Sequence, residues 1–71
     1  MLRTLVTSSS LQSIGYDAGS LVLEVEFVGG AVYQYFLVPR REYTGLMDAD
    51  SHGRYFNANI RDRYPFKKLS D

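Results

Sequence analysis

Some residues of this sequence have the side chains that enzymes use for catalysis. Ser8–Ser10 and the single histidine, His52, would be a nucleophile and a general base. Glu24 and Glu26 would be a pair of carboxylates on one face of a strand. Nucleophilic catalysis needs the base and a third, orienting group held against the nucleophile in a site that excludes water. The serines instead lie in a polar N-terminal segment, His52 begins a predicted helix, and alternating glutamates are typical of a solvated strand. We therefore predict a protein that is not an enzyme and has no catalytic residue.

Metal and cofactor sites are not expected either. The chain has no cysteine, which excludes disulfides, iron–sulfur clusters and thiolate ligands. One histidine cannot form a multi-histidine zinc site. Asp48 and Asp50 lack the spacing of the oxygen ligands in a calcium loop. The prediction is a domain without metal or cofactor.

Tyrosine is abundant, with six tyrosines and four phenylalanines in the chain. Tyr33 and Tyr35 have strand spacing, so their rings lie on one face, and tyrosine suits both protein interfaces and base stacking. The register expected below places Glu24 and Glu26 opposite these rings, and carboxylates repel phosphates. Tyr33 and Tyr35 are therefore a candidate interaction surface that alone is a poor nucleic-acid site. Two structural alternatives stay open, in which the rings only cover the outer sheet surface or lie beneath the N-terminal segment.

The C-terminal part of the sequence is basic. Residues 52–68 contain five Lys and Arg residues against one acidic residue, Asp62. Arg54 and Arg61 are seven residues apart, so on a helix they lie nearly in line with Asn57 between them, and such a ridge can hold phosphates. These groups could instead pair with acidic side chains of the chain itself. The candidate nucleic-acid-binding residues are Arg54, Asn57, Arg61, Lys67 and Lys68.

Three strands are predicted to come first in the chain. They are Leu11–Tyr16, Leu21–Val28 and Ala31–Val38, and the second of them alternates most regularly. Asp17–Ser20 forms the first turn, and Gly29-Gly30 supplies two residues that accept a positive φ in a tight hairpin.

The loop of that hairpin determines which side chains face the core. A two-residue loop pairs Val28 with Ala31 and places Tyr33 and Tyr35 on the face opposite the core. A three-residue loop would bring both tyrosines into the core, and it remains the alternative. The core face expected from the two-residue loop carries Ile14, Tyr16, Leu21, Leu23, Val25, Phe27, Val32, Gln34, Phe36 and Val38.

Two short helices, Pro39–Ala49 and His52–Arg63, are expected after the strands. Pro39 suits a first helical turn, and Asp50 or Ser51 can cap the second helix. Each helix has an apolar stripe that must be buried on the apolar face of the sheet. The predicted fold class is α+β, a three-stranded antiparallel β-meander with its second strand central and two short helices packed on one face (βββαα). The stripes are Tyr43, Leu46 and Met47, and Phe56, Ile60 and Tyr64.

Length and composition fit a single small domain. The 71 residues are expected to form one domain, residues 1–71, in which residues 1–8 are a flexible arm. Eight Lys and Arg residues balance eight Asp and Glu residues, and zero net charge disfavours the bulk basicity of many nucleic-acid binders. No apolar run reaches the roughly 18 residues of a transmembrane span, and residues 1–17 lack a signal-peptide core. We expect a cytoplasmic protein without a membrane partner.

Several short motifs are shared with a known family. They are Ser9-Ser10, Ile14–Asp17, Leu23–Phe27, Tyr33–Tyr35, Val38-Pro39, Ala49, Ser51, Gly53, Tyr55–Asn57 and Ile60-Arg61. With these motifs the sequence resembles the KTSC domain, which is named for the C-terminus of some lysyl-tRNA synthetases and also occurs as small stand-alone bacterial proteins. The association with those synthetases implies RNA binding. Arg40-Arg41 departs from the family pattern and adds positive charge.

Two functions therefore remain open. One is a small RNA-binding module, with tRNA as the RNA implied by the resemblance. The other is a protein–protein interaction module that uses the Tyr33/Tyr35 sheet face or a sheet edge. Salt separates them, because phosphate contacts weaken steeply between about 50 and 200 mM salt whereas an aromatic protein interface changes little.

Overall fold

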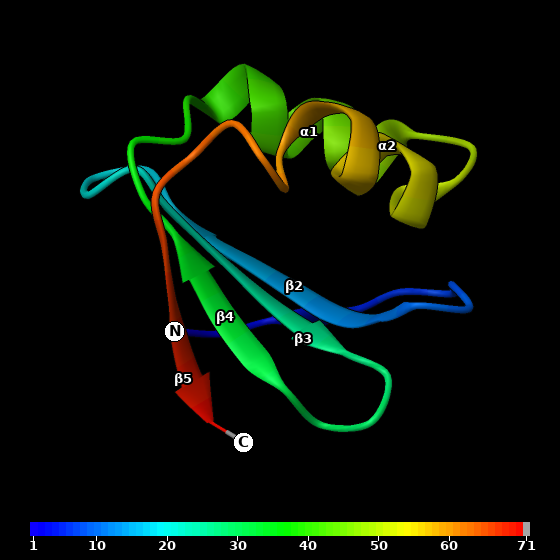
Figure 1. Cartoon of the computed structure of the whole chain (residues 1–71). Helices are drawn as coiled ribbons and strands as arrows, with labels where there is room; N and C mark the ends of the chain where they lie inside the picture. The colour runs from blue at the N-terminus through cyan, green and yellow to red at the C-terminus, as the bar shows by residue number, and fades with distance from the viewer. Residues whose placement is uncertain (71) are drawn as a thin grey trace.

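The protein is an antiparallel sheet covered on one face by two helices (Figure 1). The structure, a computed structural model, describes residues 1–70. The strands follow chain order across the sheet, β1-β2-β3-β4-β5, so β3 is central. The α+β class with two helices and an antiparallel sheet is confirmed, but the sheet has five strands and not the three expected. The elements are β1 (Thr4–Leu5), β2 (Leu11–Asp17), β3 (Val22–Phe27), β4 (Val32–Tyr35), α1 (Arg40–Asp48), α2 (His52–Asn59) and β5 (Phe66–Ser70).

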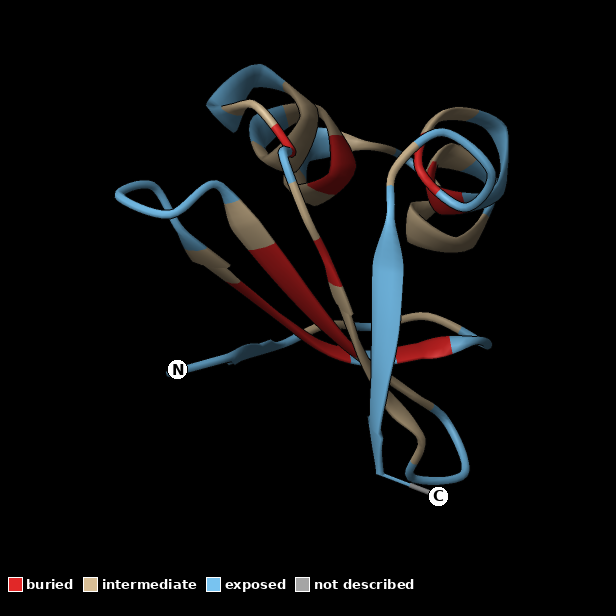
Figure 2. Ribbon diagram, turned by 60° about the vertical axis from the view of Figure 1, so that its left-hand side comes forward, coloured by how far each residue is buried: buried red, intermediate tan, exposed pale blue. Residues whose placement is uncertain are grey.

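The two additional strands are the outer ones. β1 pairs Thr4 with Ile14 and Leu5 with Ser13, and it lies within the residues 1–8 expected as a flexible arm. β5 pairs with β4 and is exposed along its whole length (Figure 2). An edge strand that is not buried on either face carries little of the apolar alternation by which strands are recognised. The sequence Phe66–Ser70 therefore gave no strand signal.

The hairpin between β3 and β4 has a three-residue loop, which makes the expected two-residue register wrong. Val25 pairs with Tyr33 and Leu23 with Tyr35, so both tyrosines lie on the face covered by the helices. The backbone N–H of Phe27 donates to the carbonyl of Ala31 at 2.8 Å, which closes the loop around residues 28–30. Gly29 and Gly30 have φ of 108° and 104°, and a glycine pair of this kind serves a three-residue loop as well as a two-residue one.

The core lies between the helices and the inner face of β2, β3 and β4 (Figure 2). Four residues expected in it are elsewhere. Leu21 is 39% exposed in the first turn with a φ of 59°, and the new register moves Gln34 to the outer face. Val32 and Phe36 are only half-buried. Tyr35 lies in the core, whereas the two-residue loop would have placed it on the opposite face of the sheet. The buried core is Leu11, Ile14, Leu23, Val25, Tyr35, Val38, Leu46, Phe56 and Ile60.

The helices bury the stripes that their sequences present, but the second one is shorter than expected. Leu46 of α1 and Phe56 of α2 are fully buried, and Ser51 caps α2 by accepting the N–H of Arg54 at 3.2 Å. α2 ends at Asn59 and not at Arg63, because the N–H groups of both Ile60 and Arg61 turn back to the Phe56 carbonyl at 3.0 Å. Arg61 thus lies in the turn that follows α2.

The outer face of the sheet is covered in part by the N-terminal segment. A Cβ on Gly15 would lie 2.6 Å from the Leu2 carbonyl oxygen, so only glycine lets the segment cross β2 there. Arg3 then reaches Glu24, with its guanidinium 2.7 Å from one carboxylate oxygen. Within residues 1–70 no helix is long and apolar enough to cross a membrane.

Candidate nucleic-acid interface

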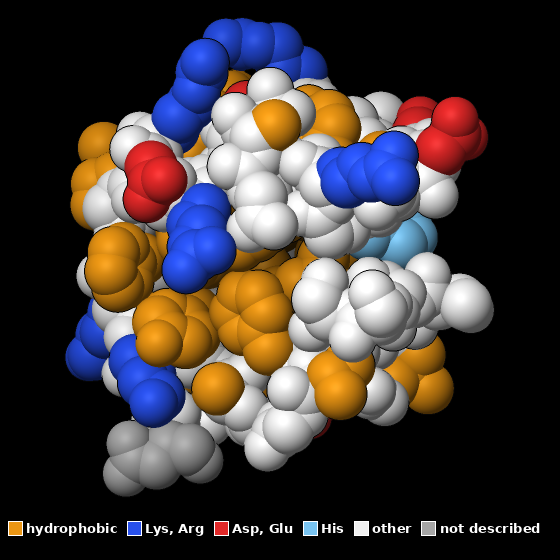
Figure 3. All heavy atoms as spheres, turned by 45° about the vertical axis from the view of Figure 1, so that its right-hand side comes forward, with side chains coloured by type: hydrophobic (Ala, Val, Ile, Leu, Met, Phe, Trp, Pro, Cys, Tyr) orange, Lys and Arg blue, Asp and Glu red, His pale blue; other side chains and the backbone are white. Residues whose placement is uncertain are grey.

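A groove of about 630 Å³ opens between α2 and the edge of the sheet formed by β4 and β5. Figure 3 shows apolar side chains gathered in a hollow of this surface, with Lys and Arg side chains around it. Its floor and one wall are aromatic, and the other wall comes from α2 and the turn after it. The lining residues are Ser10, Phe27, Ala31, Tyr33, Tyr35, Gly53, Phe56, Asn57, Arg61, Asp62 and Phe66.

Three rings from two neighbouring strands form the aromatic part of the groove. β5 pairs with β4 so that Phe66 lies opposite Tyr35, and the Phe66 ring centroid is 5.9 Å from those of both Tyr33 and Tyr35. The two tyrosine rings stack at 6.3 Å with 23° between their planes. Tyr35 is only 4% exposed whereas Phe66 is 59% exposed. Phe66 is therefore the ring that a ligand reaches first.

Phe56 of α2 supports this aromatic floor from the core side. Its ring makes edge contacts with Phe27 and Tyr35, each with 5.3 Å between centroids. Edge-to-face pairs of this kind add to the free energy of burying the rings themselves. The position of Tyr35 is thus fixed by packing, and burial raises its pKa to about 12.

The polar side chains around the groove come from both walls. Asn57 and Arg61 are exposed on the helical wall, and Asp62 follows them. On the strand wall, the Lys68 ammonium lies 5.9 Å from the centroid of the Tyr33 ring, within the range of a cation–π contact. The groove thus combines aromatic rings with cationic side chains at its rim.

The structure brings together groups that the sequence had placed on opposite faces. Tyr33, Tyr35, Asn57 and Arg61 all line the groove, and Lys68 lies beside it over Tyr33. The expectation that glutamates lie next to the tyrosine rings is wrong, because Glu24 and Glu26 pair with Gln34 and Val32. The electrostatic objection to phosphate near the rings therefore no longer applies.

Besides Lys68, which lies beside the groove, two further candidate residues do not line it. Arg54 is exposed on α2, one turn before Asn57, and does not line it. Lys67 pairs with Gln34 in the β4–β5 ladder, so its side chain points to the outer face of the sheet, away from Phe66 and Lys68. The five basic and amide candidates are therefore not one continuous ridge.

The residue that sequence reasoning missed is Phe66. No local pattern marks it, because Phe66-Lys67-Lys68-Leu69 does not alternate between apolar and polar residues and follows directly after Pro65. Ser10 also lines the groove, where a Cβ on Gly53 would lie 2.5 Å from the Ser10 hydroxyl oxygen. Gly53 therefore allows α2 to begin against the serine segment. The Ser8 hydroxyl accepts the N–H groups of Ser10 and Leu11, which makes the serine run a bend before β2.

A carboxylate between the helices fixes the helical wall. Glu42 of α1 accepts the hydroxyls of Tyr55 and Tyr64 at 2.7 and 2.9 Å. This hydrogen bond to Glu42 is the main cause that raises the pKa of Tyr55 to about 12, with burial a further cause. A Cβ on Gly45 would collide with the Tyr55 ring, so the glycine permits this contact. His52 contacts the Leu46 carbonyl through Nδ1 at 2.8 Å, which ties the start of α2 to α1.

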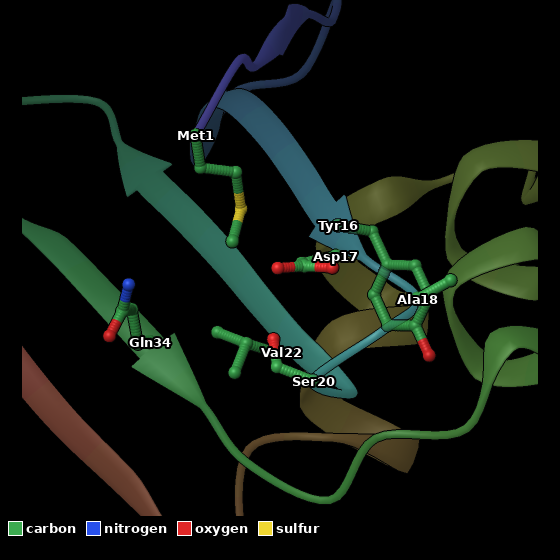
Figure 4. Close-up of a pocket in the computed structure, with 7 residues that line it drawn as sticks. All are labelled: Met1, Tyr16, Asp17, Ala18, Ser20, Val22 and Gln34. Carbon is green, nitrogen blue, oxygen red and sulfur yellow. The ribbon is translucent and has the colours of Figure 1, made fainter.

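A second, shallower hollow of about 520 Å³ lies near the N-terminus (Figure 4). Met1, the first β-turn and Gln34 of β4 contribute to it. Its acidic residue, Asp17, has a lowered pKa because it accepts hydrogen bonds from the Ser20 side chain and the Gly19 backbone. That carboxylate stabilises the turn. Among residues 1–70, no cluster of three His, Cys, Asp or Glu side chains could hold a metal ion.

Known proteins share both the sequence and the fold of this chain. The KTSC domain family model matches residues 7–64. The crystal structure of a KTSC domain protein from Yersinia pestis superposes with a TM-score of 0.92 and 38% identity over 97% of both chains. An uncharacterized protein of Stutzerimonas stutzeri is 51% identical over 64 residues, 90% of each chain. A lysine–tRNA ligase of Nostoc punctiforme is 36% identical over 62 residues, which are 87% of this chain and 11% of the ligase.

Proposed function

This chain belongs to the KTSC domain family, and from its aromatic groove we propose that it is a small RNA-binding module without catalytic activity of its own. The observation that carries the proposal is the exposed Phe66 ring, which lies beside Tyr33 and lines the same groove as Arg61. Aromatic faces next to cationic side chains are what single-strand-binding proteins present to bases and phosphates. We propose the cytoplasm, where tRNA is found, as its location.

The charges around the groove support contact with phosphates. Arg61 presents a guanidinium that can hold a phosphate through two parallel hydrogen bonds, and Lys68 adds a second cation on the facing wall. Asp62 lies at the same rim and reduces the positive potential there. With zero net charge on the whole chain, we expect moderate affinity that depends on a few local contacts.

The relatives support RNA over other ligands of an aromatic groove. Lysine–tRNA ligases from three cyanobacterial strains contain a segment 32–36% identical to this chain over 62 residues. That segment is 11% of each ligase, which is the size of an appended module. A module in an enzyme that acts on tRNA has that RNA at hand, and the same groove in a separate chain would serve a similar ligand.

Titration with RNA tests this proposal directly. Labelled tRNA and an unstructured RNA are each titrated with the protein at about 50 and 200 mM salt, with fluorescence anisotropy as the readout. We expect affinity to fall steeply over this salt range and amide NMR shifts to concentrate around the groove. Arg40→Ala is the matched control, because Arg40 is an exposed arginine at the start of α1 that does not line the groove. No binding at the lower salt would reject the proposal.

Addition of a protein strand to β5 is the second candidate function. All five residues of β5 are exposed, and among residues 1–70 the strand pairs only with β4, so its other edge can pair with an extended peptide. Lys67 and Lys68 on this strand disfavour pairing with a second copy of the chain, because like charges would meet. NMR shifts that follow the β5 backbone and are insensitive to salt would favour this function over RNA binding.

A further inference from the structure

We infer that the groove takes an unpaired segment of single-stranded RNA whose base stacks on Phe66 while Arg61 binds the adjoining phosphate, an inference that rests on the proposed function. Phe66 and Arg61 both line this groove, one from β5 and one from the turn after α2. A nucleotide offers a flat base and a charged phosphate that fit these two walls. The geometry of the rings then determines whether single-stranded or double-stranded RNA can enter the groove.

The exposed part of the aromatic cluster is a corner and not a flat platform. Phe66 is tilted 48° to Tyr33 and 38° to Tyr35 at centroid distances of 5.9 Å. Tyr35 is 4% exposed and already in contact with Phe56, so its face is not accessible to a ligand. A base can lie flat against Phe66 with its edge toward Tyr33. That arrangement requires the face of the base that lies on Phe66 to be released from its stacked neighbour in the RNA, and its edge to be free of a pairing partner.

Double-stranded RNA cannot provide such a base. In an A-form helix the bases are paired and stacked on one another, and the deep, narrow major groove does not admit side chains. Phe66 and Tyr33 line a groove between two walls and do not project from the surface as a wedge. The volume of about 630 Å³ lies within the range of small-molecule pockets, so it suits a base and its sugar and not a duplex.

The polar groups at the rim indicate a site that binds any of the four bases. Stacking on an aromatic ring is available to every base, since each has a π face. Asn57 is the one amide side chain among the lining residues, and it is exposed at the rim beside Arg61. A single flexible amide gives weak discrimination compared with the several fixed donors and acceptors of a base-reading site. We therefore infer selection for unpaired RNA and not for one sequence.

The test uses a single tryptophan as the reporter. The chain contains no tryptophan, so Phe66→Trp places the only indole on the groove wall and preserves a stacking surface. The probes are an oligoadenosine of about thirty nucleotides, long enough for its A·U duplex to be stable, and the same strand annealed to oligouridine. We expect the single strand to quench the tryptophan and to bind at least about fivefold tighter than the duplex. The oligouridine strand alone is expected to bind within about tenfold of oligoadenosine.

A second pair of variants separates stacking from a loss of folding. Phe66→Ala should weaken binding of the single strand at least about fivefold and leave duplex binding unchanged. Leu5→Ala is the control, since Leu5 is an apolar residue of the opposite edge strand that is 73% exposed. Equal or tighter binding of the duplex would overturn the inference while the proposed RNA binding survives. Binding of neither probe would reject the proposed function itself.

Discussion

The two faces of the sheet carry similar charged and polar side chains but use them differently. On the outer face Glu24 is 6% exposed and receives both Arg3 and the Gln34 amide, at 2.7 and 2.9 Å. Glu26 accepts the Ser13 hydroxyl at 2.8 Å. On the helix side, Arg61 is exposed at the rim of the groove, and within residues 1–70 the ion pairs found are those of Arg3. The ion pair of Arg3 and Glu24 holds the N-terminal segment on the outer face of the sheet, whereas Arg61 borders a groove that can receive a ligand.

Pairing within the fold therefore distinguishes a structural charge from one that is available for binding. From the sequence, the glutamates and the arginines looked equally solvated. In the structure the outer glutamates are hydrogen-bonded to Arg3, Ser13 and Gln34, whereas the groove leaves the Phe66 ring and Arg61 exposed. Experiments that remove one group from each face should therefore separate effects on stability from effects on RNA binding.

The largest expected effect is on stability and comes from the floor of the groove. Phe56→Ala should lower the free energy of unfolding by about 3–5 kcal/mol, because a buried ring that contacts Phe27 and Tyr35 leaves a cavity. Urea denaturation followed by circular dichroism measures this loss. Phe66→Ala is the matched control and should change stability by less than about 0.5 kcal/mol, since Phe66 is 59% exposed. Equal losses in the two variants would contradict the division into a fixed floor and an accessible wall.

The outer network should give the next largest effect. Glu24→Ala removes the acceptor of both Arg3 and Gln34, so we expect a loss of about 1–3 kcal/mol in the free energy of unfolding. RNA affinity should stay unchanged, because Glu24 faces away from the groove. Denaturant unfolding and RNA titration on the same preparation measure both quantities. A rise in RNA affinity on removal of Glu24 would show that the two faces are electrostatically coupled.

Arg61 should show the reverse pattern, with an effect on binding and none on stability. Arg61→Ala should weaken binding of all RNA sequences by a similar factor and lower the salt slope of log K by about one unit. Arg54→Ala should have a smaller effect, since Arg54 does not line the groove. Anisotropy titrations at several salt concentrations give both slopes. If Arg54→Ala weakens binding as much as Arg61→Ala, the RNA binds along the exposed face of α2 and not in the groove.

The smallest expected effect is a pH dependence at alkaline pH. Tyr35 and Tyr55 have pKa values raised to about 12 from an ordinary value of 10.0, so the folded state retains their protons more strongly than the unfolded state. Their contribution to stability is complete below pH 10 and is lost as pH rises from about 10 to 12. Thermal melting across this range should show a decline that is shallower in Tyr55→Phe. An identical decline in wild type and variant would mean that the Glu42 contact does not govern the pKa of Tyr55.

The sequence predicts the central part of this fold because its pattern is regular there. Alternation over β3 and the apolar stripes of the helices follow from burial on one side, which local periodicity reports. The sequence of β5 shows no such periodicity, because an edge strand with every residue exposed can have almost any polar sequence. The register of β4 depends on one residue in the loop, and Gly29-Gly30 satisfies both loop lengths.

The candidate site shows the same limit. Residue types alone single out Tyr33, Tyr35, Asn57, Arg61 and Lys68, because aromatic, amide and cationic groups are informative wherever they occur. They single out Arg54 and Lys67 equally, and these two residues lie outside the groove. Their meeting in one groove depends on the loop register and on the return of the chain as β5, which are long-range properties. Phe66 could not be assigned to the site before its strand was known.

The position of β5 has a consequence for the motion of the groove. One wall, formed by α2 and the turn after it, is held by the Glu42 contacts and by Phe56 in the core. The facing wall is a strand attached through a single ladder with every residue exposed, which is the kind of segment that opens locally while the rest of a domain remains folded. We therefore expect β5 to open locally more often than the wall formed by α2. A ligand in contact with both Phe66 and Arg61 would connect the two walls. It should then slow amide hydrogen exchange along β5 by a much larger factor than in β3, whose amides are already protected.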